Sequence, residues 1–438
     1  MESSASTKGA EGCPVAHNDK AILAEASLTD PKILAHPNDF YRAMRHEQPV
    51  FYDEKLGMWL VSRYEDIAAV SRDPATFSME KGYEKIYASG HAAEFKEILE
   101  RDGQGFFPDA IMSDPPYHTR IRRLMEHAFS AHRVKQLEPR IAEVVGELTE
   151  KLADQGHADA VNDFAVPMTI AIIAEQLGLG DVDGKKIQRW SHAVTQQIGK
   201  LQSREDMLKH AAEICELQNY LIGHIRDREA NPREDMISDL VHARDEDDPE
   251  PKLNFKEVVS LVRALLIAGN ETTATGLGNL FFILATQPEI AQLLNDAVDK
   301  DDDRLITRFV EELLRIEPPV RGLSRMTTRE TELGGAKLPA GAHMLLLFAS
   351  GNDDDTMFEC PREFDMDRGN VGKHLSFGVG VHRCIGISLA RMEIKVAARE
   401  IARRLDNIKL AVPVEEIRYL PTVATRSIES LPITFTRR

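Results

Sequence analysis

Residues 254–285 form one long, mostly apolar segment with helical spacing. Asn254, with Glu257 three residues later, predicts a capping box at its start. At 1.5 Å per residue, a helix of about 30 residues extends roughly 45 Å, which is the width of a domain. A helix this apolar must be largely buried, so the other elements are expected to pack around it.

The composition is that of a globular protein: 438 residues, 42% hydrophobic and 29% charged, with 71 acidic and 54 basic side chains that give a net charge of −17. This balance argues against nucleic-acid binding, which requires a basic surface. The sequence contains no run of 18 apolar residues, so no membrane-spanning helix is predicted. Residues 1–20 are polar, without a secretory pattern, and are expected to form a disordered tail on a cytoplasmic protein.

The remaining pattern predicts many helices and few strands. Residues 49–62 are typical of a hairpin, whereas 79–112 are expected to be irregular around one short helix at 92–101. Further helices are expected at 117–129, 134–155, 162–177, 183–200, 204–228, 233–243 and 384–405. Short strands are expected at 336–339, at 343–348 and in the tail 408–438, with an irregular meander at 351–383. No βα alternation is present, which excludes a Rossmann fold or an α/β barrel.

The strongest local motif is the ten-residue sequence FGVGVHRCIG at 377–386. Its glycines permit positive φ and close backbone approach. Cys384 falls at the start of a predicted helix, where backbone N–H groups stabilise a thiolate. Such a thiolate is suited to be an axial metal ligand. The alternative is a turn with a buried cysteine. The four cysteines of the chain form no CxxC pair, which disfavours a structural zinc site.

This motif resembles the heme-binding loop of the cytochrome P450 family, Phe-Gly-x-Gly-x-His-x-Cys-x-Gly, at every fixed position. The resemblance implies a mainly α fold, a triangular prism of about a dozen helices with small β-sheets, formed by residues 21–438 as a single heme domain. It also implies heme b (iron protoporphyrin IX) with Cys384 as its axial thiolate ligand. Phe377, Gly378 and Gly386 would belong to the cofactor-binding loop.

The segment Ala268-Gly269-Asn270-Glu271-Thr272-Thr273 is unusually polar for a buried helix. Its polar residues are either incidental or mark a local widening of the helix that admits a ligand and ordered water. The segment is similar to the family's acid–alcohol pair. The resemblance implies that Thr272 stabilises dioxygen over the heme and that Glu271, where many members have Asp, helps to deliver protons.

Other matches concern charged residues. His118 and Arg122 share a helix face and, with Arg325 and His382, resemble the family's contacts to the heme propionates, although the first two alone are also typical of a solvated face. Glu312 and Arg315 alone are typical of a surface ion pair, but resemble the family's Glu-x-x-Arg motif, with Arg368 in the third place and a structural role. The chain departs from the family's Ala-Asn-Arg-Asp sequence at 350–354, where an acid replaces the arginine.

By the same resemblance, the substrate pocket would draw on the 79–112 loop, the 162–205 helices, the long helix near Ala264, Leu265 and Ala268, and the segment near Val320 to Leu323. Candidate apolar residues are Phe106, Phe107, Ile111, Leu265, Ala268 and Val320. For Phe106, Phe107 and Ile111 the alternative is an ordinary anchoring role in the loop. An apolar pocket indicates a hydrophobic substrate such as a terpenoid, a steroid or an aromatic compound.

The predicted function is a heme-thiolate monooxygenase that inserts one atom of O₂ into such a substrate. No GxGxxG or CxxC-type cluster motif is present, so electrons are expected from a separate ferredoxin with its ferredoxin reductase. Arg123, Arg383 and Arg391 form a candidate docking patch for the ferredoxin, or are simply solvated charges. We expect a monomer. Two alternatives remain: a peroxide-driven peroxygenase, which the Glu271/Thr272 pair disfavours, and a non-catalytic heme or ligand-binding protein.

Overall fold

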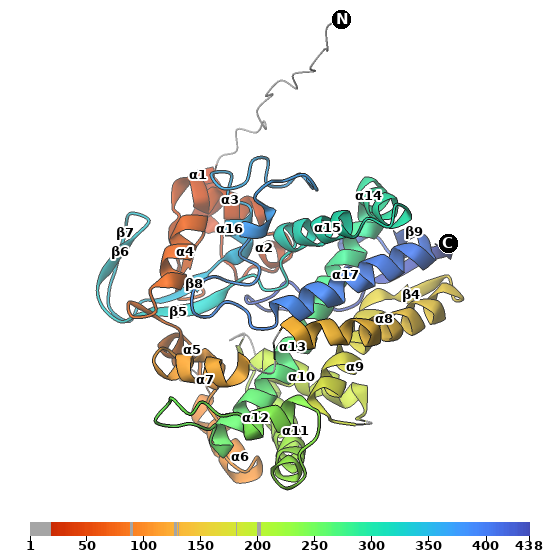
Figure 1. The fold of residues 1–438 in the computed structure, drawn as a ribbon. Helices are drawn as coiled ribbons and strands as arrows, with labels where there is room; N and C mark the ends of the chain where they lie inside the picture. Colours follow the sequence, from red (N-terminus) through yellow and green to blue (C-terminus); the bar gives the residue numbers. More distant parts are fainter. Residues whose placement is uncertain (1–18, 88–90, 127–128, 130, 181, 199–202) are drawn as a thin grey trace, which may run out of the picture.

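The computed structural model describes residues 19–87, 91–126, 129, 131–180, 182–198 and 203–438. Helix α13 (Phe255–Thr286) runs through its centre (Figure 1). The predicted capping box is present: the Asn254 side chain accepts the Glu257 N–H at 3.0 Å, and the Glu257 carboxylate accepts the Asn254 N–H at 2.8 Å. Helix α13 is buried along most of its length, as its composition predicts.

The helices around α13 form two groups. Below it in Figure 1 lie α5 (Met79–Tyr87), α6 (Ala92–Asp102), α7 (Tyr117–Glu126), α9 (Val166–Leu177), α10 (Gly184–Ile198), α11 (Arg204–Ala230) and α12 (Met236–His242). Along its other side lie α8 (Ala131–Ala153), α14 (Pro288–Asp299), α15 (Asp303–Ile316) and α17 (Ile387–Arg404). Apolar side chains from α8, α13, α14, α15 and α17 form one large core, and those of α7 and α9–α13 form a second.

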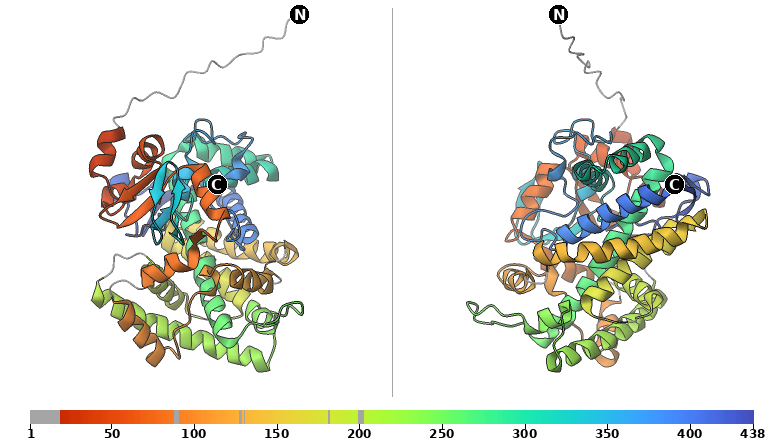
Figure 2. Two further views of the ribbon diagram at one scale, coloured as in Figure 1. Left: turned by 90° about the vertical axis from the view of Figure 1, so that its left-hand side faces the viewer. Right: turned by 45° about the vertical axis from the view of Figure 1, so that its right-hand side comes forward.

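Three small sheets complete the fold. The largest has the order β1–β2–β8–β5–β3, with only the β2–β8 pair parallel. Its strands are β1 (Val50–Asp53), β2 (Met58–Val61), β3 (Phe77–Ser78), β5 (Leu323–Thr327) and β8 (His343–Leu346). The others are β4 (His157–Asp159), β10 (Pro432–Arg437) and β9 (Leu405–Leu410), and the hairpin of β6 (Thr331–Leu333) and β7 (Ala336–Leu338). The largest sheet packs with the N-terminal helices α1 (Asp19–Glu25), α2 (Pro31–Ala35), α3 (Asn38–Glu47) and α4 (Tyr64–Arg72), as Figure 2 shows from the side.

The mainly α class and the 49–62 hairpin are confirmed, and several boundaries differ. The short helix expected at 92–101 is confirmed as α6, but the rest of 79–112 is less irregular than predicted, because its described residues also form α5 and a short 3₁₀ turn, η1 (Ala110–Met112). Gly82 misled the prediction: it lies inside α5, where an added Cβ atom would be 3.0 Å from the backbone of Arg325. The helix predicted at 162–177 starts instead as a π-helix, η3 (Ala160–Ala165). The described helices are more numerous than the dozen expected, because short ones such as α16 (Phe348–Asn352) are included in the numbering.

The two ends of the chain also differ from expectation. Asp19 and Lys20 belong to α1 rather than to a disordered tail, and residues 1–18 of that predicted tail lie outside the described residues. The tail 408–438 is less strand-like than predicted, because a mostly irregular stretch separates β9 from β10. Among the described helices, none is both long and apolar enough to cross a bilayer.

Candidate active site

The loop 377–386 has a conformation that its glycines make possible. Gly378 and Gly380 have φ values of 64° and 79°. A Cβ atom on Gly380 would lie 2.2 Å from the Ser71 carbonyl oxygen, so no other residue fits there. The Cys384 N–H donates to the Phe377 carbonyl at 2.9 Å and closes the loop. The backbone therefore fixes the position of Cys384, and the loop packs against α4 at Gly380.

Cys384 precedes the first turn of α17, which begins at Ile387 rather than at Cys384 as predicted. Burial raises the pKa of its thiol, whereas the Gly386 N–H and the charges of Arg122, Arg383 and Arg391 oppose that rise. The residue is nonetheless exposed by surface area.

One face of α13 is more exposed than the rest of the helix. Ala268 is exposed and Thr272, four residues later on the same face, is partly exposed, although most of α13 is buried. The Thr272 hydroxyl donates to the Ala268 carbonyl at 2.8 Å. The local widening considered for this segment is absent, since α-helix continues through all of 255–286. The threonine hydroxyls satisfy the carbonyls of the preceding turn, so the helix accommodates polar residues without opening.

Glu271 faces a different space from Ala268 and Thr272. It lines a cleft of about 740 Å³ between α10, α13 and the segment 412–432. Lys185, Arg189 and His192 of α10 line the same cleft. Burial raises the pKa of the Glu271 carboxyl to about 7. This group therefore holds a proton near neutral pH beside a polar cleft, which suits a proton donor.

His118, Arg122, Arg325 and His382 lie close together, as predicted. The rings of His118 and His382 have centroids 4.2 Å apart. His118 Nδ1 and His382 Nε2 are buried without a hydrogen-bond partner among the described residues. Burial, Arg325 and Arg122 all lower the pKa of His382.

Arg325 is only 3% exposed, and its guanidinium donates to the Ser324 carbonyl at 2.7 Å. Burial lowers its pKa to about 10. The carboxylate that influences both Arg325 and His118 is Asp114, whose oxygens already accept from Ser78 and Met79. Buried cations and free donors of this kind require an anion. The two carboxylates of a heme would fit that requirement, and the Cys384 thiol would be available as a sulfur ligand.

The predicted Glu312–Arg315–Arg368 triad forms and is buried. Arg315 binds both Glu312 oxygens at 2.8 Å, and Arg368 Nε binds Glu312 Oε1 at 3.0 Å. Arg315 also donates to the Asn352 carbonyl at 2.9 Å, and Asn352 accepts the Leu375 N–H at the base of the Cys loop. The triad thus ties α15 to the segment that leads into the loop.

At 350–354, where the sequence departs from that of the family, both acidic side chains have partners. Asp353 is buried and pairs with Arg362 at 3.3 Å. Asp354 accepts the Tyr64 N–H at 2.8 Å and thereby caps α4. Local packing is therefore intact without the family's arginine.

The six candidate pocket residues are not all together. Phe107 and Leu265 are core residues of the second apolar core, with Ile111 half-buried beside them. Phe106 packs instead with α6 and α11, where Lys96 lies over its ring at 5.5 Å. Val320 packs with the large sheet and bridges to Thr425. Of the six, Ala268 has the clearest open surface.

Two buried polar groups near the acid–alcohol pair were not predicted. Asn270 accepts from Thr169 at 2.8 Å and donates to Ser191 at 3.0 Å, which joins α13 to α9 and α10. Glu393 of α17 is buried beside Thr273, and burial raises its pKa to about 8. For Glu393, the available signal in the sequence was a glutamate on the apolar face of a predicted helix. The contacts of Asn270 could not be predicted from the sequence, because its partners lie far from it in the chain.

The three candidate docking arginines differ in whether they form ion pairs with acidic side chains. Arg123 pairs with Asp248 at 2.7 Å and with Asp245 at 3.2 Å. Arg391 binds both oxygens of Glu311 at 2.6 Å. Arg383 is exposed. The acidic partners neutralise two of the three cations, so the patch is less basic than the sequence suggested.

Comparison with known proteins places these features in a family. The model of the cytochrome P450 family matches residues 108–410. The chain is 35% identical to the cyclomarin C epoxidase CymV of Salinispora arenicola, over 90% of this chain and 94% of that one. It is 31% identical to the 6-deoxyerythronolide B hydroxylase of Saccharopolyspora erythraea, over 90% and 96%.

Among solved structures, that of cytochrome P450 CYP109Q5 from Chondromyces apiculatus superposes with a TM-score of 0.81 at 32% identity, covering 95% of this chain and 99% of that one. The family implies a heme with a cysteine thiolate as axial ligand. A family match over most of the chain, the similar fold and the shared loop lead to one conclusion: this chain belongs to the cytochrome P450 family and is a monooxygenase.

Proposed function

We propose that Cys384 is the axial ligand of the heme and that His118, Arg122, Arg325 and His382 hold its propionates. The observation that carries this proposal is the set of buried donors and cations around one accessible thiol, with Asp114 already engaged elsewhere.

The heme, when bound, supplies the activation of O₂. The chain's own residues do the rest. The Gly386 N–H and the loop backbone orient the Cys384 sulfur. Thr272 presents a hydroxyl whose proton now goes to the Ala268 carbonyl and whose oxygen can accept another. Glu271 holds a proton at its carboxyl near neutral pH and borders the polar cleft that renews it.

The substrate would be a hydrophobic small molecule bound over Ala268, the small residue on the open face of α13. Relatives named for the epoxidation of cyclomarin C and the hydroxylation of 6-deoxyerythronolide B support a secondary metabolite as the class. Terpenoids, steroids and aromatic compounds are the first candidates to test. The decisive screen follows the Soret band, since a substrate that displaces distal water shifts the spin state of the iron.

Electrons would come from a separate ferredoxin with its reductase, in the cytoplasm, and the protein would act as a monomer. The presence of an acid at Glu271 and an alcohol at Thr272 favours this route over a peroxide-driven one, because a peroxide-driven enzyme needs no residues for proton delivery. Turnover with peroxide far above that with ferredoxin would reverse this choice.

The ligand assignment is tested by Cys384→His. The variant is expected to lose the red-shifted Soret band of the ferrous–CO form, because that shift requires an anionic sulfur on the iron. Cys215→Ala, which removes a buried thiol from another core cluster, should keep the band. A normal band in Cys384→His would refute the assignment.

A further inference from the structure

Four side chains from three segments form a cluster at the start of the loop 377–386. Phe377 opens the loop, and the guanidinium carbon of Arg391, on α17, lies 5.0 Å from the centroid of its ring. The ring of His374 also packs with that of Phe377, with centroids 5.7 Å apart. Glu311 of α15 binds Arg391 through both carboxylate oxygens at 2.6 Å and lies 3.3 Å from His374 Nε2. We call these four residues the loop brace.

The ion pair of the loop brace is more enclosed than an ordinary surface pair. The side chain of Glu311 is 13% exposed and that of Arg391 is 30% exposed. A surface pair of flexible side chains contributes little, but a bidentate arginine–carboxylate pair has a fixed geometry. The aromatic ring next to the guanidinium adds a cation–π contact. Arg391 is therefore engaged inside the protein, which leaves its guanidinium little freedom to reach a protein partner.

The loop brace is connected to Cys384 in two ways. The Phe377 carbonyl accepts the Cys384 N–H at 2.9 Å, so the position of Phe377 helps to set the position of Cys384. The charge of Arg391 also acts on Cys384 directly, since it is one of the charges that oppose the rise in the pKa of that thiol. Glu311 binds the same guanidinium, so the charge that acts on the sulfur depends on both partners of the ion pair.

We propose that Arg391 is a positioning residue of the heme site, which fixes Phe377 and whose charge, balanced by Glu311, acts on the Cys384 sulfur. This inference rests on the proposed ligation of the heme by Cys384. It gives Arg391 a role inside the protein in place of the ferredoxin contact considered from the sequence. Groups behind a metal ligand tune the donor strength of that ligand and the reduction potential of the metal.

The test measures the reduction potential of the holoenzyme in two variants that change the charge of the loop brace in opposite directions. One electron, supplied by dithionite through mediator dyes, adds a negative charge to the iron and its ligands, so a nearby positive charge raises the potential. Arg391→Met leaves the Glu311 carboxylate unbalanced, and the potential should fall. Glu311→Gln leaves the Arg391 cation unbalanced, and the potential should rise. A loss of packing alone would not give shifts of opposite sign.

The double variant Arg391→Met/Glu311→Gln separates the effect of charge from that of bracing. It removes both charges, so its potential should return close to that of the wild type. Phe377 still lacks its cation, so the red-shifted Soret band of the ferrous–CO form should decay several-fold faster on mild heating than in the wild type. Arg391→Lys keeps the charge but not the bidentate pair, so it should keep a potential close to that of the wild type.

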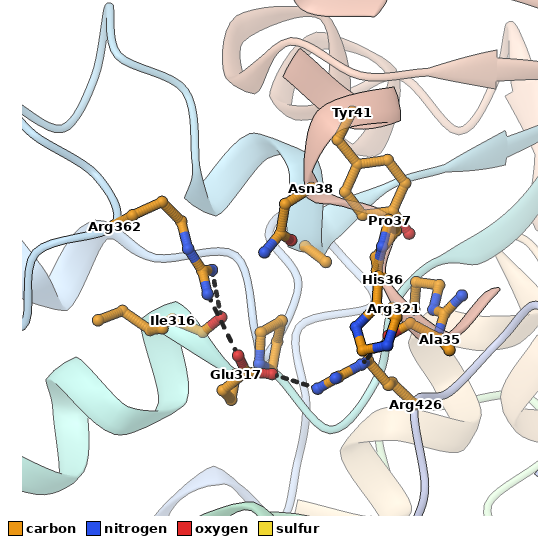
Figure 3. A pocket seen from close by; sticks show the side chains of 12 residues that line it. Ala35, His36, Pro37, Asn38, Tyr41, Ile316, Glu317, Arg321, Arg362 and Arg426 are labelled. Atoms are coloured by element: carbon orange, nitrogen blue, oxygen red, sulfur yellow. Dashed lines mark hydrogen bonds and ion pairs between the residues drawn. The ribbon is translucent and has the colours of Figure 1, made fainter. Parts of the chain in front are cut away.

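Arg426→Met is the matched control. Arg426 also pairs with a glutamate, Glu317 directly after α15, at 2.9 Å, and its guanidinium also lies over an aromatic ring, that of Tyr419, at 4.2 Å. Figure 3 shows Glu317 between Arg426 and Arg362, beside residues of the N-terminal helices rather than beside the loop 377–386. This variant should keep the potential of the wild type.

Three results would overturn the inference when the wild type shows the red-shifted band. The first is an equal potential in the wild type, Arg391→Met and Glu311→Gln. The second is a shift of the same sign in both single variants, and the third is an equally large shift in Arg426→Met. If Arg391→Met does not retain heme, a potential of Glu311→Gln at or below that of the wild type overturns the inference by itself. A wild type without the band would instead refute the ligation by Cys384, on which the inference rests.

Discussion

At the scale of single residues, Thr272 and Glu271 are neighbours in sequence with different surroundings. Thr272 lies on the partly exposed face of α13 that also carries Ala268, whereas Glu271 lines the polar cleft. A helix turns about 100° per residue, so adjacent side chains reach different spaces. This division suits a relay in which one residue meets the reacting oxygen and the other meets solvent.

Thr272→Ala is expected to uncouple the enzyme. Loss of the hydroxyl removes the donor nearest the proposed oxygen site, so reductant consumption should continue while product falls several-fold and peroxide appears. Thr286→Val is the matched control, because Thr286 also donates to the carbonyl four residues earlier but lies at the far end of α13. Unchanged coupling in Thr272→Ala would contradict the role.

Glu271→Gln tests the raised pKa. In the wild type the carboxyl is protonated below about pH 7 and ionised above it, so coupling should fall as pH rises through 7. The glutamine variant should couple poorly and show no step near pH 7. Product formed per reductant, measured from pH 5.5 to 8.5, checks this; an identical step in both proteins would assign it to another group.

Glu271 also affects stability with a definite sign. Its folded-state pKa lies above the ordinary value of 4.5, so the folded protein binds the proton more tightly than the unfolded chain does. The free energy of unfolding should therefore decrease as pH rises from about 4.5 to 7, relative to Glu271→Gln. Denaturant titrations of both proteins across this range measure the difference; a wild type that gains stability relative to the variant over this range would contradict the raised pKa.

At the scale of elements, Asn270 is the point where α13 is joined to α9 and α10. All three side chains are buried: Asn270, Thr169 and Ser191 are at most 2% exposed. Ser191 precedes His192, and Asn270 precedes Glu271, so the hydrogen bonds fix two residues of the cleft relative to each other. The joint therefore sets the shape of the cleft that serves Glu271.

Asn270→Leu should lower the free energy of unfolding by about 1–3 kcal/mol, because it removes the donor to the buried Ser191 hydroxyl, whereas Thr169 still donates to the Ala165 carbonyl. Coupling should fall as well, since α10 is no longer held beside Glu271. Asn295→Leu on α14 is the control. Denaturant unfolding and product yield test the two effects, and a loss of stability with full coupling would show that the joint is only structural.

At the scale of the whole molecule, charge governs the encounter with a redox partner. The net charge of −17 would oppose the approach of the proposed ferredoxin if that partner is also acidic, and acidic neighbours pair with Arg123 and Arg391. Within the candidate docking patch, steering would therefore rest mainly on Arg383, which is exposed.

Arg383→Gln should slow reduction by the ferredoxin several-fold at low salt, and the wild-type rate should fall as salt rises. Arg101→Gln, at an exposed residue of α6, should match the wild type. Stopped-flow reduction at several salt concentrations measures both effects. A rate independent of salt would eliminate the patch.

Local patterns determined a large part of this protein. The buried helix α13 with its capping box, the 49–62 hairpin and the loop around Cys384 follow from spacing, composition and glycine placement, all of which depend on residues close in sequence. The family resemblance added the residues expected at the heme propionates and Arg368 as the third member of the Glu312 triad. The structure brings His118 close to His382, and Arg368 close to Glu312.

Only the tertiary structure decided what depends on distant segments. It placed Gly82 inside α5 against Arg325, paired two docking arginines with acids, and separated Phe106 from Phe107. Each outcome is set by which side chains meet after folding, and desolvation then sets their charge. A linear pattern records the residue types but not these meetings, because burial and pairing arise only when the segments pack.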